Sequence, residues 1–378
     1  MNRGDGEARF VVGCVRERDL IADAKMHVAA GDVRSWSRVV RLAMRHGVVA
    51  HVRSAIIDGE VPVPAPTIGA LREAELSDIA TALVLDAELA RALEALRSKG
   101  IGALVLKGPV LARRLYRDPV LRPYRDIDIC VREADLEAAA ATLVGIGFRE
   151  IAYEAEIARL PFAADEVGGG FHRLFVDASW RALLELHSDP LQLGLAPAAE
   201  DDRWTRAIPV PDLGPGALTL GDEDQLLQLC VHAHKHGFDR LMWLKDLDLF
   251  VRARAAALDW RLVDDVAARE GVRASIWYAL SLTATILGAP FPATAARMAP
   301  APPIRFLYRR VWPVDRIAGL SAGMRRRAVQ FHVAESWRGM VPTLVLMGRR
   351  RDRARLLLAS LGRRSTETQP ASHGGRTG

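Results

Sequence analysis

Two aspartates on one predicted strand are the residues of this sequence best placed to do chemistry. Asp126 and Asp128 lie within Arg-Asp-Ile-Asp-Ile-Cys-Val, residues 125–131. Side chains alternate between the faces of a strand, so both carboxylates project from one face, about 7 Å apart. Buried like charges are costly unless a cation neutralises them, and such oxygen ligands suit Mg²⁺ or Mn²⁺. The pattern therefore predicts a divalent-metal site.

A third carboxylate, Glu185, is predicted to join this site from a later strand. Alternation over residues 181–187 places Glu185 and His187 on one face of that strand. If the two strands are neighbours, three carboxylates can hold two metal ions, which activate an attacking oxygen and stabilise a leaving phosphate oxygen. For His187, orienting a carboxylate, binding substrate and a purely structural role are the alternatives.

The segment before the aspartates predicts a contact with phosphate. Residues 101–106 read as a buried strand, followed by Lys107-Gly108 and a short helix. An ammonium and backbone amides at the start of a helix are a favourable environment for phosphate groups. Lys107 is one of five lysines among 52 lysines and arginines, which hints that a compact cation is needed there. These features together indicate phosphoryl or nucleotidyl transfer.

Arg122 and Arg125 precede the aspartates and are further candidates for this site. Both guanidinium groups could neutralise the charge of a triphosphate. We expect one of the two to be functional and the other structural.

Composition narrows the class of protein. The chain has 378 residues, half of them hydrophobic, which is ample for a buried core. Its three cysteines are far apart and show neither a disulfide framework nor a zinc spacing, so a reducing cytoplasm is expected. The N-terminus is charged where a signal peptide needs an apolar stretch. The uncharged run between Arg273 and Arg297 is interrupted by serine, threonine and proline, which predicts a buried helix and a turn rather than a membrane span. The oligomeric state stays open.

The positive charge is concentrated near the C-terminus. Residues 301–378 contain sixteen arginines against four acidic residues, a net charge of +12. Such a region could bind nucleic acid or an anionic substrate. Because no aromatic interleaving or known nucleic-acid module accompanies the charge, a solvated face with an unstructured tail is favoured.

Hydrophobic periodicity predicts an α+β fold with a small mixed sheet between helical segments. Strands are expected over 101–106, 125–131, 171–176 and 181–187, and helices over about 36–55, 67–98, 110–116 and 136–144 and through most of the chain after 223. The predicted organisation is a poorly ordered segment (1–34), an N-terminal helical region (35–98), an αβ core (99–220), a C-terminal helical domain (221–360) and a disordered tail (361–378).

Two groups in the C-terminal helical region invite a chemical interpretation. His232 and His236 are one helical turn apart, a spacing that zinc-binding helices use, but no glutamate or cysteine pair supports a metal, so a structural role is favoured. Asp246 and Asp248 diverge by about 200° on a helix and cannot repeat the strand geometry. A position of Asp246 at the cleft beside Lys245 is the less favoured alternative.

Several segments resemble the uncharacterised bacterial nucleotidyltransferase family of the polymerase-beta superfamily. They are residues 106–116, 118–119, 121–131, 184–187 and 243–251, together with His232 and His236, within a resemblance that spans about 35–270. The resemblance implies a minimal αβ nucleotidyltransferase core with flanking helices. It also implies that Asp126 and Asp128 bind the metals and that Glu185 completes the set, either as a ligand or as a base.

The reaction that the resemblance implies is attack by an acceptor on the α-phosphate of a nucleoside triphosphate, with release of pyrophosphate. We expect a small-molecule or peptide-like acceptor. A catalytically silent nucleotide- or partner-binding accessory protein is one alternative, and a nucleic-acid-modifying nucleotidyltransferase is another. No membrane partner is expected.

The chain departs from the superfamily pattern near the predicted phosphate contact. The superfamily places Gly-Ser or Gly-Gly before the helix, whereas this chain has Lys107-Gly108 and then Pro109. The spacing from Gly108 to Asp126 is also longer, which leaves room for Arg122 and Arg125. We therefore expect nucleotide contacts from Lys107, Gly108, Arg122, Arg125 and His187, while the nucleotide and the acceptor stay undetermined.

Overall fold

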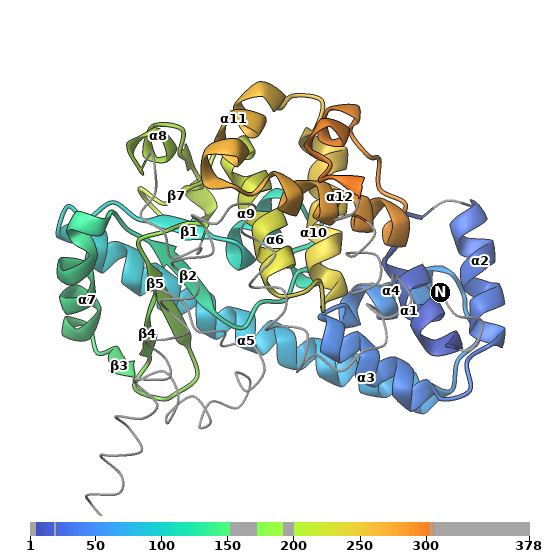
Figure 1. The fold of residues 1–378 in the computed structure, drawn as a ribbon. Coiled ribbons are helices and arrows are strands. Elements are labelled where there is room, and N and C mark those ends of the chain that lie inside the picture. The colour runs from blue at the N-terminus through green and yellow to red at the C-terminus, as the bar shows by residue number, and fades with distance from the viewer. Residues whose placement is uncertain (1–4, 19, 152–171, 192–199, 303–304, 306–378) are drawn as a thin grey trace, which may run out of the picture.

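A mixed sheet with helices on either side forms the described part of the chain, as the α+β prediction requires (Figure 1). The computed structural model describes residues 5–18, 20–151, 172–191, 200–302 and 305. The predicted disordered tail and nearly all of the basic C-terminal region lie outside the described residues. The domain boundaries stay a prediction.

The sheet places the two predicted site strands side by side. Its strands are β1 (Leu104–Leu106), β2 (Ile127–Cys130), β3 (Arg149–Ile151), β4 (His172–Val176), β5 (Leu183–His187), β6 (Ile208–Pro209) and β7 (Leu218–Thr219), in the order β3-β4-β5-β2-β1-β7-β6. β2 is antiparallel to β1 and parallel to β5. The apolar residues of β1 and β2 are fully buried, because both strands lie inside the sheet.

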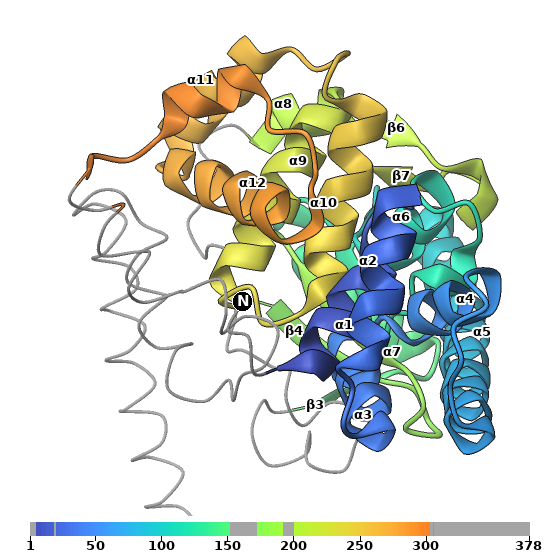
Figure 2. The same ribbon diagram turned by 90° about the vertical axis from the view of Figure 1, so that its right-hand side faces the viewer.

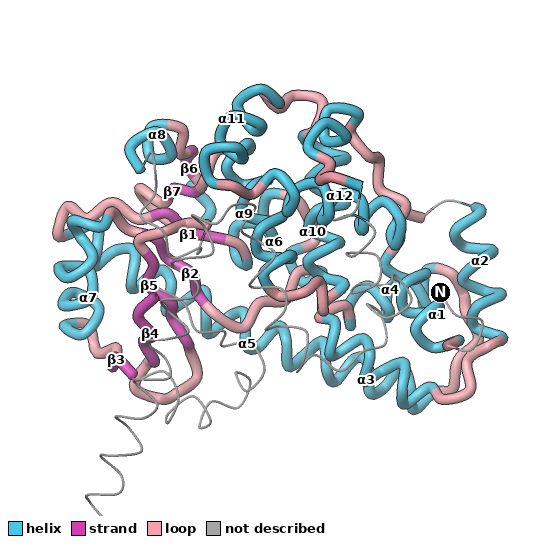
Figure 3. Tube along the Cα trace, in the orientation of Figure 1, coloured by secondary structure: helices cyan, strands magenta, loops and turns pink. Residues whose placement is uncertain are grey.

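Helices around the sheet follow the predicted pattern closely. α6 (Gly108–Arg114) follows β1, and α7 (Leu136–Gly145) packs on the sheet. α5 (Ala65–Ser98) runs from the N-terminal helices to the sheet (Figure 3). Near the sheet, Leu85, Leu89 and Leu96 join its hydrophobic core. α5 ends before Gly100, whose φ of 71° suits a residue without a Cβ. α8 (Glu200–Thr205) lies at the β7 end of the sheet.

The prediction of poor order over residues 1–34 was wrong for much of this segment. α1 (Gly6–Val15) and α2 (Leu20–Gly31) form there, and the Asp5 carboxylate caps α1 by accepting the N–H of Ala8. Phe10 and Val15 are fully buried, so hydrophobic contacts hold α1 in place. The single helix predicted over 36–55 is divided into α3 (Trp36–His46) and α4 (Val49–Asp58). Gly47, at a φ of 69°, ends α3.

The C-terminal helices lie beside the N-terminal helices (Figure 2) and share one hydrophobic core with them. They are α9 (Asp222–Lys235), α10 (Leu241–Arg254), α11 (Trp260–Glu270) and α12 (Arg273–Leu287). α1 contacts both α10 and α12, which brings the two ends of the described chain together. α12 covers the first part of the long uncharged run between Arg273 and Arg297. Across the described residues, no helix has the length and apolar character needed to cross a membrane.

Candidate active site

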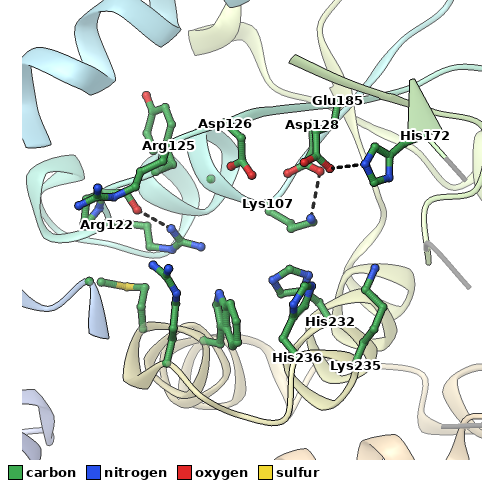
Figure 4. A pocket seen from close by; sticks show the side chains of 17 residues that line it. Lys107, Arg122, Arg125, Asp126, Asp128, His172, Glu185, His232, Lys235 and His236 are labelled. Carbon is green, nitrogen blue, oxygen red and sulfur yellow. Dashed lines mark hydrogen bonds and ion pairs between the residues drawn. The ribbon is translucent and has the colours of Figure 1, made fainter. Parts of the chain in front are cut away.

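The structure brings the three predicted carboxylates to one cleft. On the parallel pair β2 and β5, Asp128 lies directly beside Glu185. Asp126 comes just before β2, and all three side chains line the cleft in Figure 4. Asp128 is only 2% exposed, so its charge must be compensated inside the protein. The geometry is the one expected from strand alternation.

Lys107 supplies part of that compensation. Its Nζ lies 3.0 Å from Oδ1 of Asp128, because β1 pairs Leu106 with Asp128 and Lys107 follows directly. Burial alone would lower the pKa of Lys107, but Asp128, Asp126 and Glu185 outweigh burial and raise it. Lys107 has a φ of 49°, a backbone conformation that is unusual for a residue with a side chain. The ammonium is therefore held charged against the carboxylates.

Gly108 is required by close packing beside this lysine. A Cβ built on Gly108 would lie 2.7 Å from Cβ of Tyr124, which is closer than side chains tolerate. The start of α6 is thus pressed against the segment that leads into β2. The Lys-Gly pair predicted to meet phosphate has a cation at one position and a steric constraint at the other.

Two histidines extend the acidic cluster. Nε2 of His187 lies 2.9 Å from Oδ1 of Asp128 and 3.5 Å from Oε2 of Glu185. Nε2 of His172 lies 3.7 Å from the same Glu185 oxygen. The sequence did not single out His172, and its role follows from β4, which pairs it with His187. The alternation of side chains along the strand predicted over 171–176 was the signal that could have indicated His172.

These groups could hold a metal ion. The potential ligand atoms of His172, Glu185 and His187 all lie within 4.8 Å of one another. Atoms bound to one ion at about 2.1 Å lie about 3–3.5 Å from each other, which is close to the separations in this cluster. Imidazole nitrogens suit Zn²⁺ and other transition metals, whereas the carboxylate oxygen suits Mg²⁺ or Mn²⁺.

The electrostatics keep the acidic cluster ionised. Burial raises the pKa of Asp128, but the Lys107 ammonium and the hydrogen bond from His187 more than offset it and hold that pKa well below its ordinary value. Burial likewise opposes ionisation of Glu185, whose pKa is nevertheless lowered by His172 and His187. The pKa of His187 is raised, because Asp128 and Glu185 outweigh its burial. Asp128 and Glu185 are therefore anions at the cleft.

A cationic and aromatic wall from α9, α10 and the turn between them faces the carboxylates (Figure 4). Its members are His232, Lys235, His236, Arg240 and Trp243. The His232 and His236 rings lie 5.0 and 5.2 Å from the Trp243 ring, and the Arg240 guanidinium lies 5.9 Å from it. The sequence favoured a structural role for the two histidines and did not predict that they line the cleft. They do both, since they pack on Trp243 and border the site.

Lys235 was missed as a site residue by the sequence argument. Burial and the nearby Lys107 charge lower the pKa of Lys235 to about 8. It is another of the five lysines in this arginine-rich chain, and it lies between two histidines on one helix. That rarity was a usable signal, but its position opposite the carboxylates depends on how α9 packs.

Both predicted arginines line the cleft, and both are paired. Nε of Arg122 donates to Oδ1 of Asp246 at 2.8 Å, and the Tyr116 hydroxyl donates to the same oxygen at 2.7 Å. Arg125 lies 3.2 Å from Asp78 and is about one third exposed, so it is the freer of the two cations. Arg122 is the more constrained of the pair.

Asp246 and Asp248 diverge as predicted. Asp248 pairs with Lys245 and Arg252, whereas Asp246 holds Arg122. The alternative that placed Asp246 and Lys245 at the cleft was wrong. Asp246 is buried behind Arg122, and Lys245 lines a different cavity.

The comparisons with known proteins place the chain in a family. A family model described as uncharacterised nucleotidyltransferase matches residues 32–288. The chain belongs to this family. A search of curated proteins found no match. The matched span contains the acidic cluster and the cationic wall, so both sides of this cleft lie within the family region. α1 and α2 precede it.

Proposed function

We propose that this nucleotidyltransferase moves a nucleoside monophosphate from a nucleoside triphosphate to a small-molecule or peptide-like acceptor and releases pyrophosphate. The observation that carries the proposal is the pairing of three carboxylates with Lys107 on one side of a cleft whose other side is cationic and aromatic. Carboxylates attract divalent metals, and the cations suit phosphates. We include membership of the polymerase-beta superfamily, because an Asp-x-Asp strand follows a strand–Lys-Gly–helix element.

The residues present fit Mg²⁺ or Mn²⁺. Asp126, Asp128 and Glu185 carry three negative charges, and the Lys107 ammonium offsets one of them. The remaining negative charge and the oxygen donors match what hard divalent cations require. Asp126, Asp128 and Glu185 would hold the metal, which when bound supplies charge neutralisation at the α-phosphate and activation of the acceptor oxygen.

The other residues have defined tasks in this proposal. Lys107 and Lys235 neutralise triphosphate charge from opposite sides of the cleft. His187 keeps Asp128 and Glu185 oriented through its contacts with both carboxylates. Trp243, flanked by His232 and His236, offers a flat surface on which the base or a planar acceptor can stack.

Pyrophosphate release tests the reaction directly. The wild-type protein would be incubated with Mg²⁺, each of the four common nucleoside triphosphates, and a panel of hydroxyl- and amine-bearing small molecules and peptides. We expect release that depends on both metal and acceptor. Asp126→Asn should lower the rate by at least about 100-fold, since it removes a metal ligand.

The matched control for this assay is Asp212→Asn, which changes an exposed aspartate outside the cleft. It should retain the wild-type rate. An Asp126→Asn protein as active as the control would refute the assigned metal site. Triphosphate binding without turnover on any acceptor would instead favour a silent binding protein.

A further inference from the structure

A second cavity lies beside α10, farther along this helix than the cleft residues Met242 and Trp243. It has a volume of about 500 Å³, within the range of small-molecule sites. The end of α1, the residues after it, α4, α10 and the segment after α6 supply its walls. It shares no lining residue with the catalytic cleft. This cavity is therefore a separate site rather than an extension of the first.

The cavity is rich in cations. Arg16, Arg18, Arg117 and Lys245 line it, together with the carboxylates of Glu17 and Asp58. Arg18 pairs with Asp23 and Lys245 with Asp248, whereas Arg117 is 4.0 Å from Asp58, so the positive charge left for a ligand lies mainly on Arg16 and Arg117. His51 also lines the cavity. Burial and then the charges of Lys245 and Arg117 lower the pKa of His51 to about 3, so its ring is neutral in a positive environment. A negatively charged ligand is favoured there.

His51 also presents an unsatisfied polar atom. Its side chain lines the cavity, the residue is 9% exposed, and Nδ1 has no hydrogen-bond partner within the described parts of the chain. Its ring packs edge-on against Tyr116 at 5.9 Å. A buried polar atom without a partner is costly unless water or a ligand meets it.

We propose that this cavity binds a small organic anion through a phosphate or carboxylate group. Arg16 and Arg117 meet the charged group, and the neutral His51 ring borders the ligand. Residues 14–18 of the wall precede residue 32, where the family match begins. The site therefore depends on the N-terminal helices of this chain. Binding there does not rest on the reaction proposed above.

The test follows the His51 ring while two probes are added separately to the full-length protein. Inorganic phosphate and citrate represent the two anion chemistries, and ¹⁵N-labelled histidine gives the NMR signal, assigned by its loss in His51→Gln. We expect a saturable shift of the His51 signal with at least one probe. The probe that binds more tightly identifies the preferred group.

A pair of arginine variants completes the test. Arg117→Gln should weaken binding of that probe about tenfold in calorimetric titrations, because it removes a charge-assisted contact. The Arg117 side chain is 76% exposed, so the change should leave the fold intact. Arg72→Gln, an exposed change on α5 outside both cavities, should bind as the wild type does. Equal affinities in the two variants, or no His51 response to either probe, would overturn the proposal.

Discussion

Lys107 and Lys235 show how neighbouring residues can give one side-chain type two different behaviours. Both side chains line the cleft, where Lys107 is buried and Lys235 is half-buried. Lys107 is surrounded by carboxylates, which raise its pKa, whereas burial and the Lys107 charge bring the pKa of Lys235 to about 8. Only Lys235 should therefore change charge in mildly alkaline solution.

Triphosphate affinity should fall as the pH rises through 8. Lys235 is protonated below this pKa and attracts phosphate, and it becomes neutral above it. Calorimetric titration of a non-hydrolysable triphosphate at pH 7, 8 and 9 should show this loss in the wild type. Lys235→Arg, which keeps its charge across this range, should flatten the profile, and Lys235→Met should bind weakly at every pH. The same pH slope in wild type and Lys235→Arg would exclude Lys235 as the titrating contact.

At the scale of single residues, the sequence identified those site residues whose placement follows from the pattern of their own segment. Asp126, Asp128 and Glu185 lie on strands whose alternation sets their side, and Lys107 directly follows a buried run. The positions of Lys235 and Trp243 depend on the packing of α9 and α10 over the sheet. No pattern within those helices indicates which face lines the cleft, so the sequence could not place Lys235 and Trp243 there.

At the scale of elements, the connection from β1 through Lys107-Gly108 to α6 has the tightest steric constraint in the site. Gly108 packs against Tyr124, which lies in the segment before β2. Gly108→Ala should lower the free energy of unfolding by about 1–3 kcal/mol, because the methyl group forces these segments apart. Urea unfolding followed by circular dichroism measures this change.

Gly69→Ala is the matched control for that substitution. Gly69 is exposed inside α5, and an added Cβ meets no atom within 4 Å. Alanine there should raise the stability by up to about 1 kcal/mol through helix propensity. Equal effects of the two substitutions would show that the Gly108 contact is not constrained.

Element types were predicted better than element ends. The long helix α5 and the strands β1, β2, β4 and β5 follow from strong apolar patterns. The break at Gly47 was missed because apolar spacing continues across it. α1 was not predicted as a defined helix, because the contacts that bury it come from α2, α3 and α4 and from the distant α10 and α12, which the α1 sequence alone does not show.

At the scale of the whole molecule, a buried hydrogen-bonded chain joins the second cavity to the cleft. Tyr116 lines the cavity and donates to Asp246, which in turn holds Arg122 at the cleft. The chain crosses the core that the N- and C-terminal helices share. A change on the cavity side can therefore alter the position of a cleft arginine.

Tyr116→Phe should weaken triphosphate binding although Tyr116 does not line the cleft. The substitution keeps the ring and removes one donor from the buried Asp246, at a cost of about 1 kcal/mol in stability. We expect the dissociation constant of a non-hydrolysable triphosphate to rise several-fold because Arg122 is less firmly held. Tyr278→Phe, a buried tyrosine that lines neither cavity, serves as the control. Loss of stability with unchanged affinity would show that the chain carries no such effect.

The most direct test of the metal-dependent triphosphate site is calorimetric titration of a non-hydrolysable triphosphate with and without Mg²⁺. The wild type and Asp212→Asn should bind it tightly only when Mg²⁺ is present. Asp126→Asn should keep its melting temperature and lose at least about 100-fold in this metal-dependent affinity. Equal affinity in Asp126→Asn and Asp212→Asn, or binding that ignores Mg²⁺, would contradict the account.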